Sequence, residues 1–466
     1  MIKAKTILFY AVMLGAAVGV FFWIRSAGDS LLAPVGPGTF GQHGLRESGA
    51  ALSHVLVTLV VIILCARGLG AIFRRFSQPP VIGEMIAGIM LGPSLLGRMA
   101  PGVSAYLLPN SVAPFVSVIA NVGVILYMFL VGVELDTNLV RGRTHASVAT
   151  SHASIIAPFL LGSGLALWLY PIFSTNDVPF VVFALFMGVS MSVTAFPVLA
   201  RVLTDREMHT SQIGAIALAC ASVDDVTAWC LFALVVSVAR AHTGDVFITL
   251  GLTAGFIFMI FAFARPAAVW FVRLHDQRRI AGQSSIVVAC AALLAAALAT
   301  QRIGIHALFG AFLVGVIIPH DSLLAQDIKQ KFEDLVVVLF LPTFFAFTGL
   351  RTQIGLVHGL RDWLICLLII GVASVGKFGG GAIAARLTGL GWRESTSLGI
   401  LMNTRGLMEL IVLNVGMDLG VLSPTLFAML VIMAVVTTLA TTPVLQALME
   451  KPEKKFVQNW QFDEDY

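Results

Sequence analysis

The sequence predicts an all-α polytopic membrane protein with 13 to 14 transmembrane helices. Of its 466 residues, 58% are hydrophobic and 12% are charged, about half of the ~25% charged share that is typical of a soluble domain. Apolar runs of roughly 18 residues or more recur along the whole chain, which is the length a helix needs to cross a bilayer. The runs are continuous and lack the ~10-residue alternating segments of a transmembrane β-barrel.

Fourteen apolar runs have the length of a helix. The first follows Lys3 and Lys5 and is either a retained helix or a signal peptide. Residues 1–51 are therefore expected to hold this additional helix and an extracytoplasmic segment. The runs cover residues 6–24, 52–74, 81–97, 112–134, 147–170, 179–203, 212–239, 246–272, 283–301, 305–319, 333–350, 361–387, 395–416 and 423–448.

The distribution of the 29 lysines and arginines supports this count and orients it. If the N-terminus is cytoplasmic and every run crosses, 20 basic residues lie on the cytoplasmic side and seven on the other. That excess is the one that cytoplasmic loops carry in membrane proteins. Two basic residues, Lys377 and Arg405, fall in the middle of helices and are not explained by topology. We expect an inner-membrane protein of the bacterial type, with residues 449–466 as a short cytoplasmic tail.

A weak internal repeat indicates how the helices are arranged. "GEMIAGIMLGP" (83–93) resembles "GAFLVGVIIP" (310–319), with glycines five residues apart in both. We expect residues 52–240 and 283–448 to be the two copies, joined by a linker helix in residues 241–282. A single linking helix forces the copies into opposite orientations, and such inverted repeats are typical of secondary transporters with a midplane site.

The fifth helices of the two copies are both interrupted. "SVTAFPVLAR" (192–201) contains Pro197, which removes a backbone hydrogen bond in mid-helix. "NTRGLMEL" (403–410) carries Asn-Thr-Arg-Gly at a comparable depth. Paired interruptions in matching helices point to a transporter binding site, so we expect two interrupted helices that cross.

Asp224 and Asp225 stand side by side in the apolar run 213–238, in "CASVDDVTAW". A carboxylate at the bilayer centre costs roughly 2.5 to 3.5 kcal/mol on insertion scales. Neighbours on a helix point about 100° apart, so the two carboxylates face different partners. Lys377, in "ASVGKFGGG", lies at mid-depth and needs a counter-charge. We expect Lys377 to pair with one aspartate and to leave the other free to titrate.

A free carboxylate in a cavity that water can reach binds either a proton or a hard monovalent cation. If the carboxylate can change its access from one side of the membrane to the other only with a proton or a cation bound, that competition becomes an exchange of cation for proton. Four polar residues near the interrupted helices are expected to complete an oxygen shell around the cation, although serine and threonine often bond to their own helix instead: Ser192, Thr194, Ser222 and Asn403.

Other polar residues in apolar runs are expected to be structural. Arg405 and Glu409 are four residues apart, a spacing that permits an ion pair on one helix. With Glu84 and Asn403 they are expected to hold the interrupted helices and to offset half-helix dipoles. The five cysteines all lie in apolar runs, which argues against a disulfide framework or a zinc site.

Several stretches together resemble the cation:proton antiporter-2 family of monovalent cation/proton exchangers. They are "QPPVIGEMIAGIMLGPSLLG", "FLVGVELD", "SVTAFPVLARVL", "SVDDVTAW", "GKFGGG" and "NTRGLMELIVLNVG", in order between residues 52 and 448. The resemblance implies the inverted-repeat sodium/proton antiporter-like fold. It also implies a homodimer in which a core domain of each protomer moves against a dimerisation domain.

The resemblance also implies roles for single residues. Asp225 matches the essential aspartate that binds cation and proton, and Asp224 matches the acid that pairs with the lysine matched by Lys377. The doubled aspartate with lysine is similar to the electrogenic sodium-transporting branch. "DDVTAW" and "NTRGLMELIVLN" are more similar to the plant branch linked with potassium, so Na⁺ and K⁺ both stay open.

The sequence therefore predicts a secondary active antiporter rather than an enzyme, in which H⁺ and Na⁺ or K⁺ are the transported ions. Asp225 is the expected site of the monovalent cation, and Asp224, Thr194 and Ser192 are the other expected cation-binding residues. We expect no cofactor, no nucleic-acid partner and no nucleotide-binding regulatory domain.

Two alternatives to the antiporter belong to other functional classes. The first is a cation channel or a Na⁺-coupled solute carrier on a similar fold. The second is an intramembrane aspartyl protease, which needs acids converging from separate helices and a GxGD-type motif that the sequence lacks.

Overall fold

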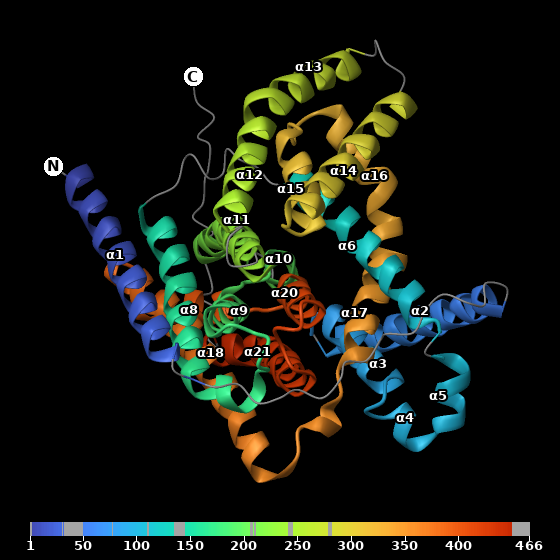
Figure 1. The fold of residues 1–466 in the computed structure, drawn as a ribbon. Coiled ribbons are helices and arrows are strands. Elements are labelled where there is room, and N and C mark those ends of the chain that lie inside the picture. The colour runs from blue at the N-terminus through green and yellow to red at the C-terminus, as the bar shows by residue number, and fades with distance from the viewer. Residues whose placement is uncertain are drawn as a thin grey trace, which may run out of the picture.

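The computed structural model describes residues 2–29, 31, 50–76, 78–109, 111–134, 145–205, 208, 211–240, 246–277 and 282–449. Over these residues the regular structure is helical throughout (Figure 1). The expected tail and most of the segment between the first two helices lie outside the described residues. The first half of the chain forms α1 (Ile2–Gly28), α2 (Ala50–Arg75), α3 (Pro80–Leu91), α4 (Leu96–Met99), α5 (Pro101–Leu107), α6 (Ala113–Glu134), α8 (His145–Phe173), α9 (Phe180–Ser192), α10 (Phe196–Asp205) and α11 (Gln212–Arg240).

The second half begins with a long bent helix. A π-helical turn at Ile260–Ala264 separates α12 from α13, and another at Val336–Phe340 separates α16 from α17. The helices are α12 (Val246–Met259), α13 (Arg265–Asp276), α14 (Gly282–Ile303), α15 (Ala307–Ile317), α16 (Leu323–Leu335), α17 (Leu341–Arg351), α18 (Gly359–Leu387), α19 (Trp392–Met402), α20 (Leu407–Asp418) and α21 (Pro424–Met449).

Each of the 14 predicted apolar runs falls on helix in the described residues, and 10 or 11 of them have the length and composition of a membrane span. Among the described residues, 10 helical segments are long and apolar enough to span a bilayer. The bent pair α19–α20 and three shorter apolar helices (Val12–Gly28, Phe180–Ser192 and Ala307–Ile317) account for the other predicted runs. The all-helical fold class is therefore confirmed.

One predicted boundary is wrong. The helix expected at residues 333–350 begins ten residues earlier, because α16 precedes it from Leu323. Ser322 caps α16 by accepting a hydrogen bond from the Ala325 N–H at 3.1 Å. Apolar length did not reveal α16 because five of its 13 residues are charged, and it buries only Leu324, Ala325 and Ile328.

The repeat is visible in how its first helices pack. By their order in the two copies, α2, α3 and α6 correspond to α14, α15 and α17. In the first copy α3 lies between α2 and α17, and in the second copy α15 lies between α14 and α6. A Cβ on Gly83 would meet the α2 backbone and one on Gly88 the α17 backbone. A Cβ on Gly310 would meet α14 and one on Gly315 would meet α6. The matching glycines therefore make matching close approaches, which only a residue without a side chain permits.

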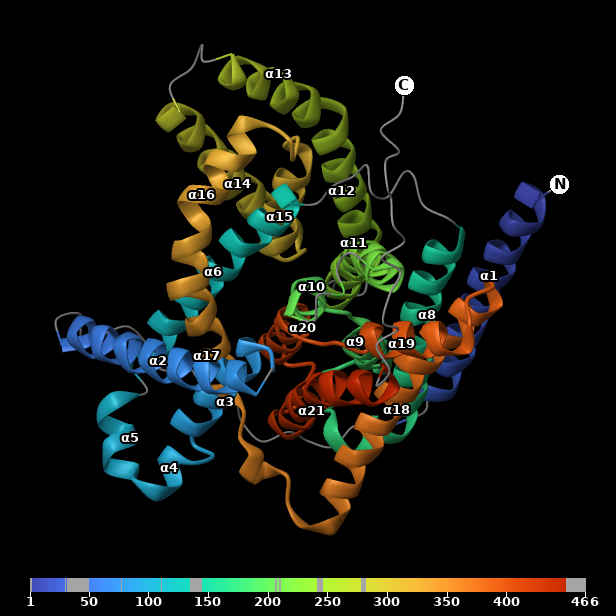
Figure 2. The same cartoon turned by 180° about the vertical axis from the view of Figure 1, so that it is seen from behind.

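The other helices pack around the interruptions. We call α8–α11 and α18–α21 the crossover group, and α2–α6 and α12–α17 the flanking group. Within the crossover group α8 packs along α18, its counterpart in the repeat. Figures 1 and 2 show this group at the centre, with the flanking helices around one side.

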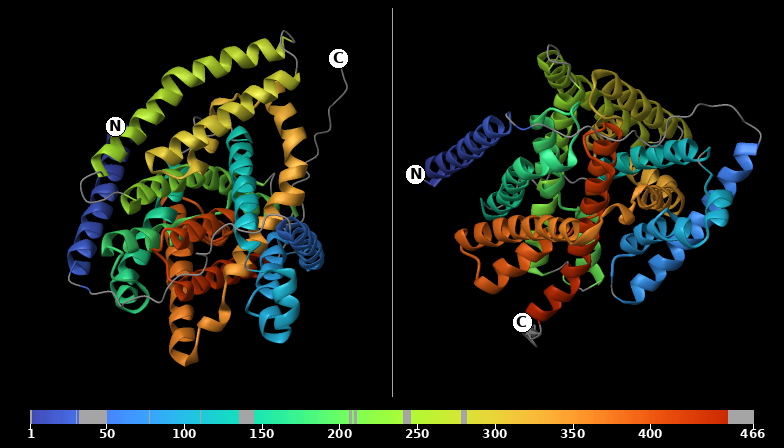
Figure 3. Two further views of the ribbon diagram at one scale, coloured as in Figure 1. Left: turned by 45° about the vertical axis from the view of Figure 1, so that its right-hand side comes forward. Right: turned by 60° about the horizontal axis from the view of Figure 1, so that its bottom comes forward.

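The additional helix α1 lies at the outer edge of the crossover group, beside α8 (Figure 3). Ile24 is buried, and the Phe21 and Phe159 rings lie 6.0 Å apart. This helix therefore packs against the crossover group and is not separated from the other helices.

Candidate functional site

The two interrupted helices meet at their breaks. α9 ends at Ser192 and α10 begins at Phe196, while α19 ends at Met402 and α20 begins at Leu407. The Ala195 N–H donates to the Thr404 carbonyl at 3.0 Å, so the two unwound segments are directly hydrogen-bonded. The crossing expected from the sequence is present, and it exposes the ends of four half-helices inside the protein.

Two cationic side chains satisfy the free carbonyls at the end of α9. Arg405 donates to the Ser190 and Met191 carbonyls, at 2.9 Å each, and Lys377 donates to the Ser192 carbonyl. The last carbonyls of a helix lack partners within it and carry the negative end of its dipole. Placing both cations here therefore satisfies hydrogen bonds and offsets charge at once.

Arg405 also forms the expected pair with Glu409. Its Nη1 lies 3.0 Å from Glu409 Oε2, and both side chains are fully buried. Glu409 stands in the first turn of α20, where a negative charge faces the positive end of that helix dipole. The pair thus joins the end of α9 to the start of α20.

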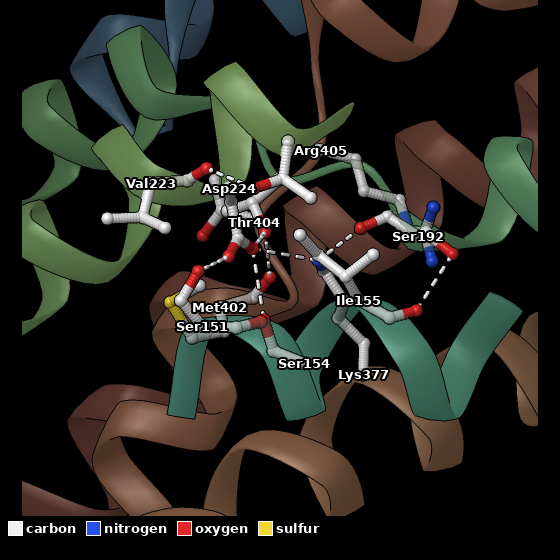
Figure 4. A network of polar contacts seen from close by, with 12 residues as sticks. Ser151, Ser154, Ile155, Ser192, Val223, Asp224, Lys377, Met402, Thr404 and Arg405 are labelled. Carbon is white, nitrogen blue, oxygen red and sulfur yellow. Dashed lines mark hydrogen bonds and ion pairs between the residues drawn. The ribbon is translucent and has the colours of Figure 1, made fainter. Parts of the chain in front are cut away.

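Asp224 is surrounded by hydrogen-bond donors (Figure 4). Its carboxylate accepts from Ser151 at 2.5 Å, from Ser154 at 3.0 Å and from Thr194 at 2.7 Å. Lys377 Nζ lies 3.2 Å from Asp224 Oδ2, and both side chains are fully buried. A buried ion pair is tolerated when further hydrogen bonds satisfy its remaining atoms, and Asp224 meets that condition.

Asp225 is the contrasting case. It is 3% exposed, and its Oδ1 has no hydrogen-bond partner. The N–H of Phe196, the first residue of α10, faces its carboxylate. An N–H at a helix start attracts negative charge, but it leaves one carboxylate oxygen free. A proton or a cation on that oxygen would remove the uncompensated charge.

The other predicted oxygen ligands have mixed surroundings. The Ser192 hydroxyl donates to the Gly188 and Ile155 carbonyls, and Ser222 donates to the Leu218 carbonyl on its own helix. Thr194 donates to Asp224 and lies 3.1 Å from the Met402 carbonyl. By contrast, Asn403 Oδ1 at the second break is buried without a hydrogen-bond partner.

Glu84 is in a different region. It lies buried on α3, and the charges that act on it are Arg67 and Arg74 of α2. The helix that carries it packs mainly against α2 and α17 of the flanking group. The expectation that Glu84 helps to hold the interrupted helices has no direct support in these contacts.

A cavity of about 590 Å³ lies elsewhere, between α12–α13 and α14–α15. Its lining is apolar and includes none of the predicted site residues. The chemistry therefore centres on the crossover and not on this cavity.

Comparison with known proteins decides the family. A family model described as "Sodium/hydrogen exchanger, transmembrane" matches residues 56–451, most of the chain. The chain belongs to this family. The Na(+)/H(+) antiporter NhaS4 of Synechocystis sp. is 41% identical over 403 residues, which cover 85% of this chain and 98% of that protein.

More distant members of the sodium/hydrogen exchanger family are longer. Cation/H(+) antiporter 19 of Arabidopsis thaliana is 38% identical over 87% of this chain and 50% of its own length. K(+)/H(+) antiporter 1 of Saccharomyces cerevisiae is 32% identical over 86% of this chain and 47% of its own length. This chain therefore spans about half of these plant and yeast relatives.

A solved structure shows the same fold. The sodium proton antiporter MjNhaP1 from Methanocaldococcus jannaschii aligns with a TM-score of 0.62 at 14% identity, covering 85% of this chain and 97% of that one. The inverted-repeat antiporter-like fold predicted for this sodium/hydrogen exchanger family member is confirmed.

Sequence reasoning missed two members of the Asp224 shell, Ser151 and Ser154. They stand three residues apart on α8 and both face the carboxylate. A signal was available, because residues three apart share a helix face and "TSHAS" (150–154) is an unusually polar stretch in an apolar run.

Proposed function

We propose that this chain exchanges Na⁺ or K⁺ for H⁺ across the membrane by alternating access, with Asp225 as the shared binding group. The observation that carries the proposal is the contrast between two adjacent carboxylates. Asp224 has four donors, including Lys377, whereas Asp225 has a buried oxygen without a partner. One charge is balanced and the other is open to a proton or a cation.

Competition at Asp225 explains obligatory exchange. An empty, ionised Asp225 would carry an uncompensated charge through the protein interior, which is costly at low dielectric. A bound proton or cation neutralises Asp225. The loaded protein therefore changes between its inward-facing and outward-facing states far more readily than the empty protein. Asp224 and Lys377 act as the auxiliary pair that fixes the site, and Asn403 Oδ1 supplies a further oxygen to the cation shell.

Further parts of the proposal rest on the sequence resemblance and on the distribution of basic residues. The exchanger works as a homodimer in a bacterial-type cytoplasmic membrane, with its C-terminus inside, and is a transporter rather than an enzyme. The resemblance to the electrogenic branch adds a second proton per cycle to the one that competes with the cation at Asp225, because one-for-one exchange at a single carboxylate moves no net charge. Each net charge per cycle then couples to about 2.3 kcal/mol per 100 mV of membrane potential. An imposed potential is then expected to change the rate, and an unchanged rate would indicate electroneutral exchange.

The test uses purified protein in proteoliposomes that contain a pH-sensitive dye. Pulses of Na⁺, K⁺, Li⁺ and Rb⁺ are applied in turn across a pH series. Only the cations that are transported should drive proton movement in the opposite direction. Protein-free liposomes give the leak. Cation flux without proton counter-movement would identify a channel and overturn the antiporter assignment.

A further inference from the structure

A polar cluster joins the last turns of α17 and α20. Arg351 Nη1 donates to Asn414 Oδ1 at 3.0 Å, and Arg351 Nη2 lies 2.6 Å from Asp418 Oδ1. Asn414 Nδ2 donates to Thr348 Oγ1 at 2.7 Å. We call these four residues the α17–α20 latch. It links the flanking group, which contains α17, to the crossover group, which contains α20.

The latch is sheltered from water at Arg351 and Asn414, while the Asp418 side chain is about half exposed, at 51%. Arg351 is only 17% exposed, and its guanidinium lies 5.4 Å from the centre of the Phe347 ring and 6.0 Å from that of Phe427. Asn414 is buried. A sheltered guanidinium stacked on aromatic rings interacts more strongly than an exposed ion pair. Breaking the latch therefore has an energetic cost at its sheltered groups, because the Arg351 guanidinium and buried Asn414 lose their hydrogen-bond partners.

Each side of the latch is rigidly attached to its own group. Next to Thr348, Gly349 packs so closely on α3 that a Cβ there would lie 2.5 Å from the Ile89 nitrogen. On the other side, α20 starts at the crossover, where Glu409 holds Arg405. Asn414 follows five residues later on the same helix. A displacement of the crossover relative to α17 is thus transmitted directly to the latch.

Aromatic side chains lie between Asp225 and the end of the protein that carries the α17–α20 latch. Trp229 stands one turn after Asp225 on α11 and is 2% exposed. Its ring stacks on Phe312 of α15, with centroids 6.2 Å apart and planes at 25°. This contact also joins the crossover group to the flanking group. The basic-residue distribution places the ends of α11, α17 and α20 on the extracytoplasmic side.

We propose that the α17–α20 latch is the extracytoplasmic gate of the exchange cycle, closed in this structure, and that it must break before Asp225 opens to that side. The inference rests on the proposed function, because alternating access requires each side to open in turn. While intact, the latch biases the protein toward the state in which this side is shut. A bias of this kind changes apparent affinity through the populations of the two facings.

Cross-linking tests whether the latch opens. Thr348→Cys with Asn414→Cys, in a background without the five native cysteines, is treated with a short, reducible thiol cross-linker. A matched pair, His275→Cys with Ser285→Cys, replaces side chains 2.9 Å apart within the flanking group. Cross-linking should stop exchange reversibly in the latch pair and spare the matched pair. Exchange that continues at the starting rate in the cross-linked latch protein would overturn the proposal.

The starting rate also separates the two claims. The background protein must exchange before the reagent is added, so its failure would count against the antiporter assignment. If the background protein exchanges and the cross-linked latch variant exchanges at the same rate, the result would count against the gate alone.

The apparent KM for cation, measured separately on each side of the membrane, distinguishes a gate from a residue that only stabilises the fold. In right-side-out and everted vesicles, Arg351→Met should lower the apparent KM for cation several-fold on the extracytoplasmic side and raise it on the cytoplasmic side. Arg361→Met, an exposed arginine at the same end, serves as the control. Equal changes on both sides, or no change, would contradict the gate.

Discussion

Lys377 Nζ lies 3.2 Å from Asp224 Oδ2, and neither side chain is exposed at all. The pair joins α18 to α11, and the same ammonium group donates to the Ser192 carbonyl at the end of α9. Three elements of the crossover group therefore meet at one charge.

Lys377→Met should lower the free energy of unfolding by about 3–5 kcal/mol, because it leaves Asp224 buried without its counter-ion. Asp224→Asn should be destabilising for the same reason. The double variant should be less destabilised than the sum of the two. Thermal unfolding of the detergent-solubilised protein measures all three, and a Lys377→Met protein as stable as the parent would show that the pair contributes nothing.

Thr194→Val removes one donor from Asp224 at nearly constant side-chain volume. Hydrogen bonds to charged groups are worth roughly 1.5–3 kcal/mol, so we expect a loss of stability of that order and several-fold slower exchange. Thr300→Val is the matched control, because buried Thr300 bonds only to carbonyls of α14. If both variants behave alike, the Thr194–Asp224 bond has no special role.

Gly132→Ala tests the close packing of α6 on α15. A Cβ at residue 132 would lie 2.3 Å from the Phe312 carbonyl oxygen, so backbone must move to make room. Overpacking of this kind costs typically about 1–3 kcal/mol. Gly164→Ala is the control, since nothing lies within 4 Å of the new Cβ. A lower melting temperature is expected for the first variant only, and equal melting temperatures would refute the close contact.

Proton and cation should compete. If both bind Asp225, acidification raises the apparent KM for the cation by up to about tenfold per pH unit once protons occupy the site, while the maximal rate falls much less. Initial rates over a grid of pH and cation concentration show this directly. Acidification that lowers the maximal rate at constant KM would indicate separate sites.

Much of the fold followed from the sequence because a bilayer leaves few choices. Helices must be long and apolar to cross it, so fourteen runs could be located, and the glycines at 83, 88, 310 and 315 revealed the repeat. The Lys377–aspartate pair was predictable because an isolated buried charge is too costly.

Features that depend on helix rotation and on polar surfaces were not predictable in the same way. The charged face of α16 hid that helix from a search for apolar length. Which aspartate Lys377 contacts depends on the rotation of α11. The residue types left this choice open, and the family resemblance alone pointed to Asp224. Asn414 donates to the Leu410 carbonyl on its own helix, but its two latch partners lie on α17, with Thr348 at a sequence separation of 66, so only packing reveals them.

Asp225→Asn tests the central claim most directly. The amide keeps the size of the side chain but binds a proton or a cation only weakly, so cation-driven proton movement in proteoliposomes should fall to the protein-free background, while the variant keeps the parent's melting temperature to within a few degrees. Ser222→Ala, three residues away and bonded only to its own helix in this structure, should retain exchange. Robust Na⁺- or K⁺-driven pH recovery by Asp225→Asn would contradict the account.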